Sequence, residues 1–201
     1  MTRFLLIRHA SHDLLGKALA GRAPGVRLNE RGKREADHLA DRLASAGIDA
    51  IYTSPRERAC DTAAPLARRL NVVPRVSSNI DEIDFGDWTG RSFMDLERDP
   101  HWPVWVERRS RAQAPNGEAF WDVQRRAVLA MDRLRNEHPA QTIALFTHGD
   151  VIKATLAHYL RISLDDLERF EVAPASVSAI VTDQAWAQVT LVNGRGAEAA
   201  Y

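Results

Sequence analysis

The stretch "FLLIRHASHD" (residues 4–13) begins as an apolar run and ends in an arginine and a histidine, Arg8 and His9. An apolar run of this length, closed by polar residues, is typical of a short strand. Three later runs have the same form and are rich in β-branched residues. We therefore predict strands at 3–7, 49–54, 142–147 and 176–182, with the first three buried.

Helical patterns separate these runs. Asn29 can cap a helix whose apolar residues recur at i, i+3, i+4 and i+7 before Gly47 ends it. Further helices are expected over 119–137 and about 150–161, while 185–193 should pair with the preceding strand as a hairpin. This order predicts an α/β protein, a three-layer α/β/α sandwich around a mostly parallel central sheet.

Two interruptions qualify this pattern. Pro65 falls inside the helical stretch "ERACDTAAPLARRL", so that helix should kink or restart there. Residues 98–118 contain several prolines and tryptophans without clear periodicity, and we expect them to form a lid that passes over the sheet. The length of 201 residues fits one domain, 1–201.

The composition narrows the choice of partners. The 27 basic residues balance 27 acidic ones, so no overall positive field draws the chain to nucleic acid or an anionic membrane. The N-terminal apolar run is too short for a signal peptide, and no stretch approaches the length of a membrane span. Cys60 is the only cysteine, which fits a reducing cytoplasm and a small core side chain. We expect a cytoplasmic protein.

In open α/β sheets, ligands bind beyond the carboxyl ends of the strands. Arg8 and His9 follow the first predicted strand, Arg58 follows the second, and His148 follows 142–147. Two guanidinium groups can hold a tetrahedral dianion through charge-assisted hydrogen bonds. A neutral imidazole beside a bound phosphoryl group can attack it, so His9 or His148 is a candidate nucleophile.

Four motifs in order, "LIRHA", "TSPRERACDTA", "DEIDFGDWTG" and "THGDVIKATL", resemble the signature blocks of the histidine phosphatase superfamily, the phosphoglycerate mutase-like enzymes. The resemblance implies that His9 carries a phosphohistidine intermediate. It makes Arg8 and Arg58 the phosphate-binding arginines and His148 the second histidine, which stabilises the transferring phosphoryl group. Glu82 occupies the position of the family's proton donor.

The proton donor has competitors. The alkoxide of a phosphomonoester is a poor leaving group unless an acid protonates it. The same acid, once deprotonated, can then activate water. Asp81, Asp84 and Asp87 lie close to Glu82 in sequence, and the choice of Glu82 depends mainly on the resemblance.

The chain also departs from the family pattern. Ala10 replaces the motif's glycine, and no asparagine follows His9 at the usual short distance, so Ser11 or His12 should supply the missing contact. Gly21 and Arg22 resemble a pair that approaches the phosphate from the same loop. The expected substrate-binding residues are Ser11, Gly21, Arg22 and Gly149.

No metal or other cofactor is expected, because the chain lacks HExxH or a comparable ligand spacing. Arg108, Arg109 and Arg111 in the expected lid could contact an acidic substrate.

These observations favour a phosphomonoesterase acting on a small phosphorylated substrate. A phosphoglycerate mutase is the alternative, although such enzymes are usually longer through an insertion that excludes water. A non-catalytic phosphate-binding module is a third reading. The sequence leaves the substrate and the oligomeric state open.

Overall fold

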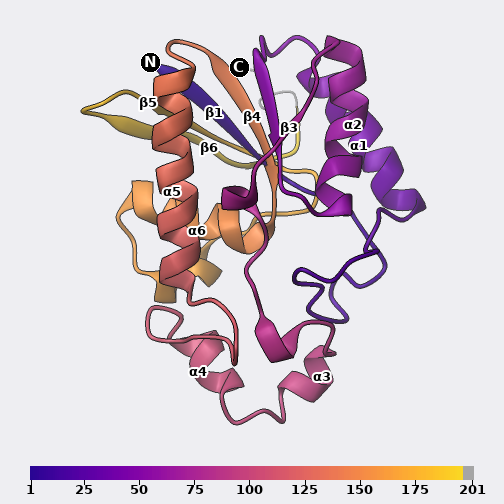
Figure 1. Ribbon diagram of the computed structural model, residues 1–201, viewed down its shortest axis with the longest axis vertical. Coiled ribbons are helices and arrows are strands. Elements are labelled where there is room, and N and C mark those ends of the chain that lie inside the picture. The colour runs from indigo at the N-terminus through magenta and orange to yellow at the C-terminus, as the bar shows by residue number, and fades with distance from the viewer. Residues whose placement is uncertain (197–201) are drawn as a thin grey trace.

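A computed structural model describes residues 1–196, and a single six-stranded sheet forms its centre (Figure 1). The strand order is β3-β2-β4-β1-β5-β6. Strands β1 to β4 run parallel to one another, whereas β5 is antiparallel to both β1 and β6. The strand bounds are Thr2–Arg8 (β1), Ala50–Thr53 (β2), Arg75–Val76 (β3), Thr142–Thr147 (β4), Val177–Thr182 (β5) and Ala187–Gly194 (β6).

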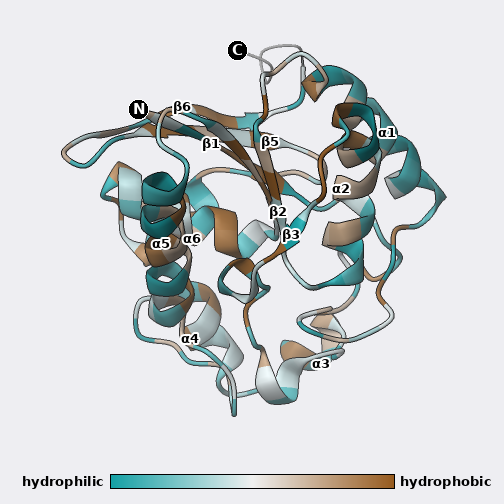
Figure 2. Cartoon of the chain, turned by 45° about the horizontal axis from the view of Figure 1, so that its top comes forward, coloured by the Kyte–Doolittle hydropathy of each residue, from teal (hydrophilic) through white to brown (hydrophobic). Residues whose placement is uncertain are grey.

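Helices cover both faces of this sheet (Figure 2). Alternate β1 side chains explain why: Leu5 and Ile7 pack with α1 and α2, while Phe4 and Leu6 pack with α5 and α6. The predicted three-layer α/β/α sandwich is confirmed. The helices are α1 (Glu30–Leu43), α2 (Glu57–Leu70), α3 (Phe93–Leu96), α4 (Trp102–Glu107), α5 (Phe120–Glu137) and α6 (Gly149–Leu160), with short 3-10 turns at Ser78–Ile80, Gly86–Trp88 and Leu164–Arg169.

Helix α1 begins as the sequence predicts. The Asn29 side chain accepts a hydrogen bond from the backbone N–H of Gly32, which satisfies one of the free donors of the first turn. The helix ends at Leu43, and Gly47 follows with φ +64°, a left-handed conformation that favours glycine.

The α2 region differs from the sequence-based expectation in two respects. Helix α2 continues through Pro65 without a restart, because the proline ring is buried in the packed face, where its contacts offset one missing backbone hydrogen bond. Strand β3 was not predicted, since its two residues are both exposed and carry no apolar pattern. Its two-residue pairing with β2 forms one edge of the sheet.

The segment between β3 and α5 contains α3 and α4, and lies below the sheet in Figure 1. Aromatic rings hold it in place: Trp88 is fully buried and lies 5.4 Å from Trp105, whose ring centroid is 4.8 Å from that of Phe120. Ile83 is buried in the same cluster. The backbone next to Glu82 is therefore anchored by an apolar core of its own.

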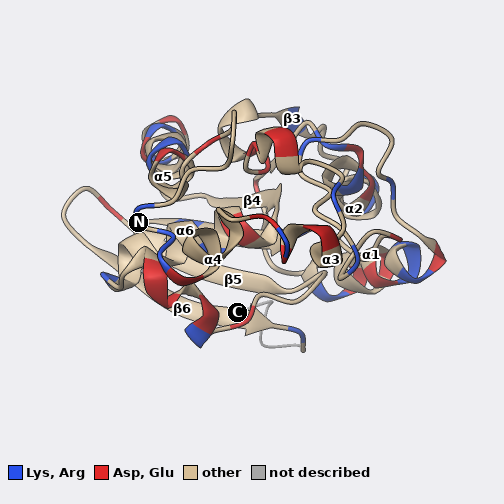
Figure 3. Cartoon of the chain, turned by 90° about the horizontal axis from the view of Figure 1, so that it is seen from below, with Lys and Arg blue, Asp and Glu red and all other residues tan. Residues whose placement is uncertain are grey.

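Basic and acidic residues are interspersed along the helices (Figure 3). This distribution agrees with the formal net charge of zero. Among residues 1–196, every helix is too short or too polar to cross a bilayer.

Candidate active site

A cavity of about 400 Å³ opens where β1 ends and the loop after it turns back over the sheet edge. The loop after β1, α2, the loop before α3 and the start of α6 form its walls. The parallel strands bring these segments to one edge, as the sequence predicts. The lining residues are Arg8, His9, His12, Leu15, Gly16, Ala18, Leu19, Ala20, Arg58, Glu82, Phe85, Phe93 and Asp150.

His9 is held in one tautomer. Its Nδ1 lies 2.9 Å from the backbone oxygen of Ala10, and because a carbonyl only accepts, Nδ1 must carry the proton. Nε2 then keeps its lone pair. Burial, followed by the charges of Arg58 and Arg8, lowers the pKa of His9 well below its ordinary value. The ring is therefore neutral near pH 7, with Nε2 as the available nitrogen.

The replacement of glycine by Ala10 is accommodated without strain. Its φ does not lie in the left-handed region, so a side chain is tolerated. The methyl group is fully buried, and the backbone N–H donates to Thr62 Oγ1 at 2.9 Å. This bond ties the loop after β1 to α2.

The two predicted phosphate-binding arginines keep donors free. Arg58 is fully buried, and its Nη2 donates to the Gly21 oxygen at 2.8 Å and approaches His148 Nδ1 at 3.1 Å. Arg58 Nε and Nη1, and Arg8 Nε, find no hydrogen-bond partner among the described residues. Buried cationic donors without partners are costly, and an anion in the cavity would satisfy them.

His148 lies behind the cavity wall, with its ring centroid 5.2 Å from that of His9. An arginine can only donate, so His148 Nδ1 accepts from Arg58 and the proton of the neutral ring is on Nε2. Nε2 then donates to Ser54 Oγ at 2.7 Å, which in turn donates to Asp81 Oδ1 at 3.0 Å. This chain fixes the orientation of the ring.

The structure separates Glu82 from its three competitors. Among the four acids, only Glu82 lines the cavity. Asp81 bonds Ser54 and the backbone of Glu82, Asp84 accepts from Gly86 N, and Asp87 accepts from Asn116. Burial, and next the charge of Asp150, raises the pKa of Glu82 to about 7. Near neutral pH this carboxyl is divided between its acid and base forms.

Two cavity residues stand out that the motifs did not assign. His12 is 5% exposed, and its Nδ1 has no hydrogen-bond partner among the described residues. Burial, and then Arg58, lowers its pKa to about 4. The sequence assigns no role to Asp150, the second residue of α6, yet Asp150 lines the cavity. No sequence signal distinguishes such an acid from a helix cap.

The other expected substrate-binding residues lie around the cavity rather than in its wall. Ser11 bonds Glu35 through its backbone N–H, and the oxygen of Gly21 accepts from Arg58. Arg22 donates to the backbone oxygen of Glu82 at 2.8 Å and pairs with Glu118. Gly149 begins α6, and a Cβ there would lie 3.2 Å from Arg8 Nε. Ser11 and His12 were the two residues expected to supply the missing contact, and of these His12 lines the cavity.

The segment expected to form a lid packs beside the site. Arg109 pairs with Glu168 at 2.5 Å and lies over the Phe120 ring. None of residues 98–118 belongs to the lining described above. A lid role for this segment stays a prediction.

His9, Glu82 and His148 bring ligand atoms within 4.8 Å of one another, and such a set can in principle hold a metal ion. Arg58 Nη2, however, lies 3.1 Å from His148 Nδ1 and 3.6 Å from Glu82 Oε2. A cation there would meet a fixed positive charge, so the donor set favours an anion.

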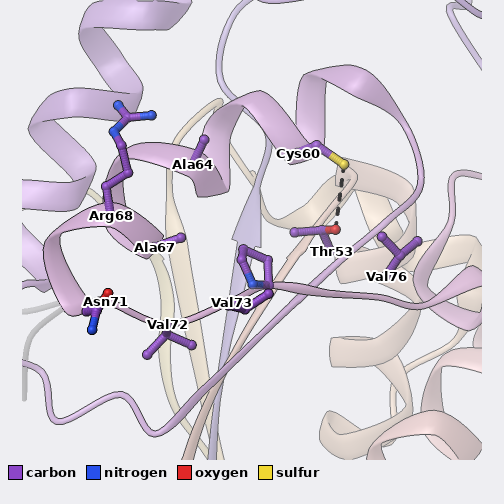
Figure 4. A pocket seen from close by; sticks show the side chains of 10 residues that line it. Thr53, Cys60, Ala64, Ala67, Arg68, Asn71, Val72, Val73 and Val76 are labelled. Carbon is purple, nitrogen blue, oxygen red and sulfur yellow. Dashed lines mark hydrogen bonds between the residues drawn. The ribbon is translucent and has the colours of Figure 1, made fainter.

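A second cavity of about 520 Å³ lies between α2 and β3 (Figure 4). Cys60 and Thr53 point toward each other there, with Sγ 3.6 Å from Oγ1. Cys60 is half-buried rather than a core residue, because the two-residue edge strand leaves this face of α2 open. The walls of this second cavity are mainly apolar, and none of the catalytic candidates lines it.

The sequence matches a known protein family over almost its whole length. The profile of the histidine phosphatase superfamily (branch 1) matches residues 4–194. The chain therefore belongs to the histidine phosphatase superfamily.

Three similar proteins illustrate the relationship. The chain is 36% identical to the bifunctional protein Rv2228c of Mycobacterium tuberculosis over 97% of its own length and 54% of the relative's. It thus spans about half of that relative. Phosphoserine phosphatase 1 of Hydrogenobacter thermophilus is 30% identical over 90% of this chain and 86% of the relative. The solved structure of Bacillus stearothermophilus YhfR superposes with a TM-score of 0.92 at 26% identity, covering 98% of this chain and 99% of the other.

Proposed function

We propose that this chain hydrolyses a small phosphomonoester through a phosphohistidine on His9. The observation that carries this proposal is the environment of His9 Nε2: a neutral ring with a fixed tautomer, in a cavity with two guanidinium groups that have free donors. Kinship with a phosphoserine phosphatase supports the hydrolytic reading.

In the first step, Arg8 and Arg58 hold the phosphoryl oxygens and neutralise their charge. His148 orients Arg58 from behind through the 3.1 Å contact. His9 Nε2 attacks phosphorus in line, and the bond between phosphorus and the ester oxygen breaks. The leaving oxygen takes a proton from the Glu82 carboxylic acid.

In the second step, Glu82 is a carboxylate and accepts a proton from water. That water attacks the phosphohistidine, the bond between phosphorus and Nε2 breaks, and inorganic phosphate leaves with His9 neutral again. A pKa of about 7 suits Glu82 to both steps, since neither protonation state is costly near neutral pH.

The test is release of inorganic phosphate from phenyl phosphate and from an alkyl phosphate. His9→Ala should abolish turnover of both, whereas His38→Ala, which removes an exposed histidine, should leave it intact. Rapid quenching of the wild type should trap acid-labile phosphate on the protein. Turnover that survives His9→Ala would refute the proposal. Transfer of the phosphoryl group back to an acceptor would indicate a mutase, and binding without turnover a binding module.

The proton donor has a sharper test. Glu82→Gln should depress turnover of an alkyl phosphate far more than formation of the phosphoenzyme from 4-nitrophenyl phosphate, whose leaving group needs little protonation. Asp87→Asn is the matched control, because that acid bonds Asn116 outside the cavity. Equal losses for both substrates in Glu82→Gln would remove Glu82 from the role of acid.

A further inference from the structure

Beyond the phosphate-binding groups, the cavity wall is largely apolar. Leu15 and Leu19 come from the loop after β1, and Phe85 and Phe93 come from the segment below the sheet. Phe85 is held in the aromatic cluster, with its ring 5.7 Å from that of Trp105. A wall of two leucines and two aromatic rings offers contact area to an apolar group.

Cationic groups in this wall are confined to the phosphate end. Arg8 and Arg58 are the basic residues among those that line the cavity. Lys17 is exposed and does not belong to the lining, although its two neighbours do. Arg109 forms an ion pair with Glu168. The described cavity therefore provides no cation beyond Arg8 and Arg58 to hold another acidic group of a substrate.

An acid lies in the wall instead. Asp150, the second residue of α6, lines the cavity, and its carboxylate forms no hydrogen bond or ion pair with the described residues. It is close enough to Glu82 to be the second cause of that residue's raised pKa. The charge of Asp150 thus extends into the cavity beside the leaving-group side of the site.

We propose that Asp150 is a specificity-determining residue, which restricts the substrates to phosphomonoesters with an apolar organic part that carries no second negative charge. This inference rests on the proposed function. Arg8 and Arg58 supply two positive charges, which a phosphate dianion neutralises, so Asp150 leaves one negative charge in excess. A substrate carboxylate would add a second one in a poorly solvated cavity, whereas an uncharged ring would add none.

The experiment compares kcat/KM for phenyl phosphate and 4-carboxyphenyl phosphate in the wild type and in Asp150→Asn. The wild type should prefer phenyl phosphate, and the variant should reduce that preference by roughly 10-fold. The wild-type preference is divided by the preference of the variant. In this ratio the difference between the two leaving groups, and any change in the acidity of Glu82, largely cancel. Asp13→Asn removes the same charge outside the cavity, where Asp13 bonds Asn29, and should leave the preference unchanged.

The outcomes are distinct. An unchanged preference in Asp150→Asn, or a wild type that favours the carboxylated substrate, would overturn the role of Asp150 while phosphate release still supports the proposed function. No release from either substrate by folded wild type would instead refute the proposed function. If Asp150→Asn unfolds, as thermal denaturation would show, Asp150→Ser removes the same charge with a smaller polar side chain and should give the same loss of preference.

Discussion

Two pairs of arginines flank Glu82, and they differ in how far their donors are used. Arg22 and Arg126 each engage all three side-chain nitrogens, with Glu118 and the backbone oxygen of Glu82 as shared acceptors. Among residues 1–196, Arg58 finds partners only for Nη2, and Arg8 donates from Nη1 to the oxygen of Val172 while its Nε has no partner. The first pair is satisfied by the protein, and the second keeps donors that, on the proposed function, hold the phosphate.

The difference separates structural arginines from binding ones. A saturated guanidinium has no donor to offer and fixes the backbone it bonds. A buried guanidinium with free donors costs stability, and a fold keeps it only where something else repays that cost. We therefore propose that Arg22, a predicted phosphate contact, positions Glu82 together with Arg126, since both donate to its backbone oxygen.

The largest effect is expected for Arg58→Gln. This change removes a cationic donor from the phosphate end, so kcat/KM for phenyl phosphate should fall by about 10² to 10³-fold. The unfolding temperature should not fall, because a poorly paired buried charge disappears at the same time. Steady-state kinetics and thermal denaturation measure both.

The same variant should lose the response to added phosphate. Inorganic phosphate at about 100 times its Kd should stabilise the wild type by roughly 2.7 kcal/mol, and Arg58→Gln should show little of this gain. An Arg58→Gln protein with normal kinetics, or with full stabilisation by phosphate, would contradict the assignment of this arginine to the ligand.

A smaller and opposite pattern is expected for Arg126→Gln. Glu118 loses partners for both oxygens, so the free energy of unfolding should decrease by about 1–3 kcal/mol. Turnover of an alkyl phosphate should fall roughly 10-fold with little change in KM, since the displaced group is Glu82 and not the phosphate site. A KM effect as large as that of Arg58→Gln would place Arg126 in the binding site instead.

The pH dependence gives the smallest predicted shift. Glu82 must be protonated for the first step, and its pKa is about 7, so kcat/KM should decline above about pH 7. His9 must be neutral, and because its pKa is lowered, the acid limb should lie well below 6.5 after correction for the substrate's own ionisation.

Asp150→Asn should move the basic limb to lower pH, because a neighbouring negative charge no longer raises the pKa of Glu82. Measured profiles of kcat/KM for wild type and variant test this. A basic limb that persists in Glu82→Gln would assign it to another group.

Much of the fold follows from local pattern. The strand at 142–147 and the helix over 119–137 agree with the structure within a residue, because burial on two sheet faces requires continuous apolar runs and a 3.6-residue stripe. Of the two alternatives expected at Pro65, a kink or a restart, the restart does not occur, because packing of α2 compensates locally. Strand β3 was not predicted, because its pairing with β2, rather than its own composition, makes it a strand.

The sequence by itself determined the layer order, the edge at which Arg8, His9, Arg58 and His148 meet, and the family, since all of these follow from periodicity and the order of motifs along the chain. Only the tertiary structure decided which carboxyl faces the cavity, which arginines keep free donors, and that Asp150 lies in the wall. The physical reason is that charge, burial and hydrogen-bond satisfaction depend on neighbours distant in the chain, such as Glu118 beside Arg22.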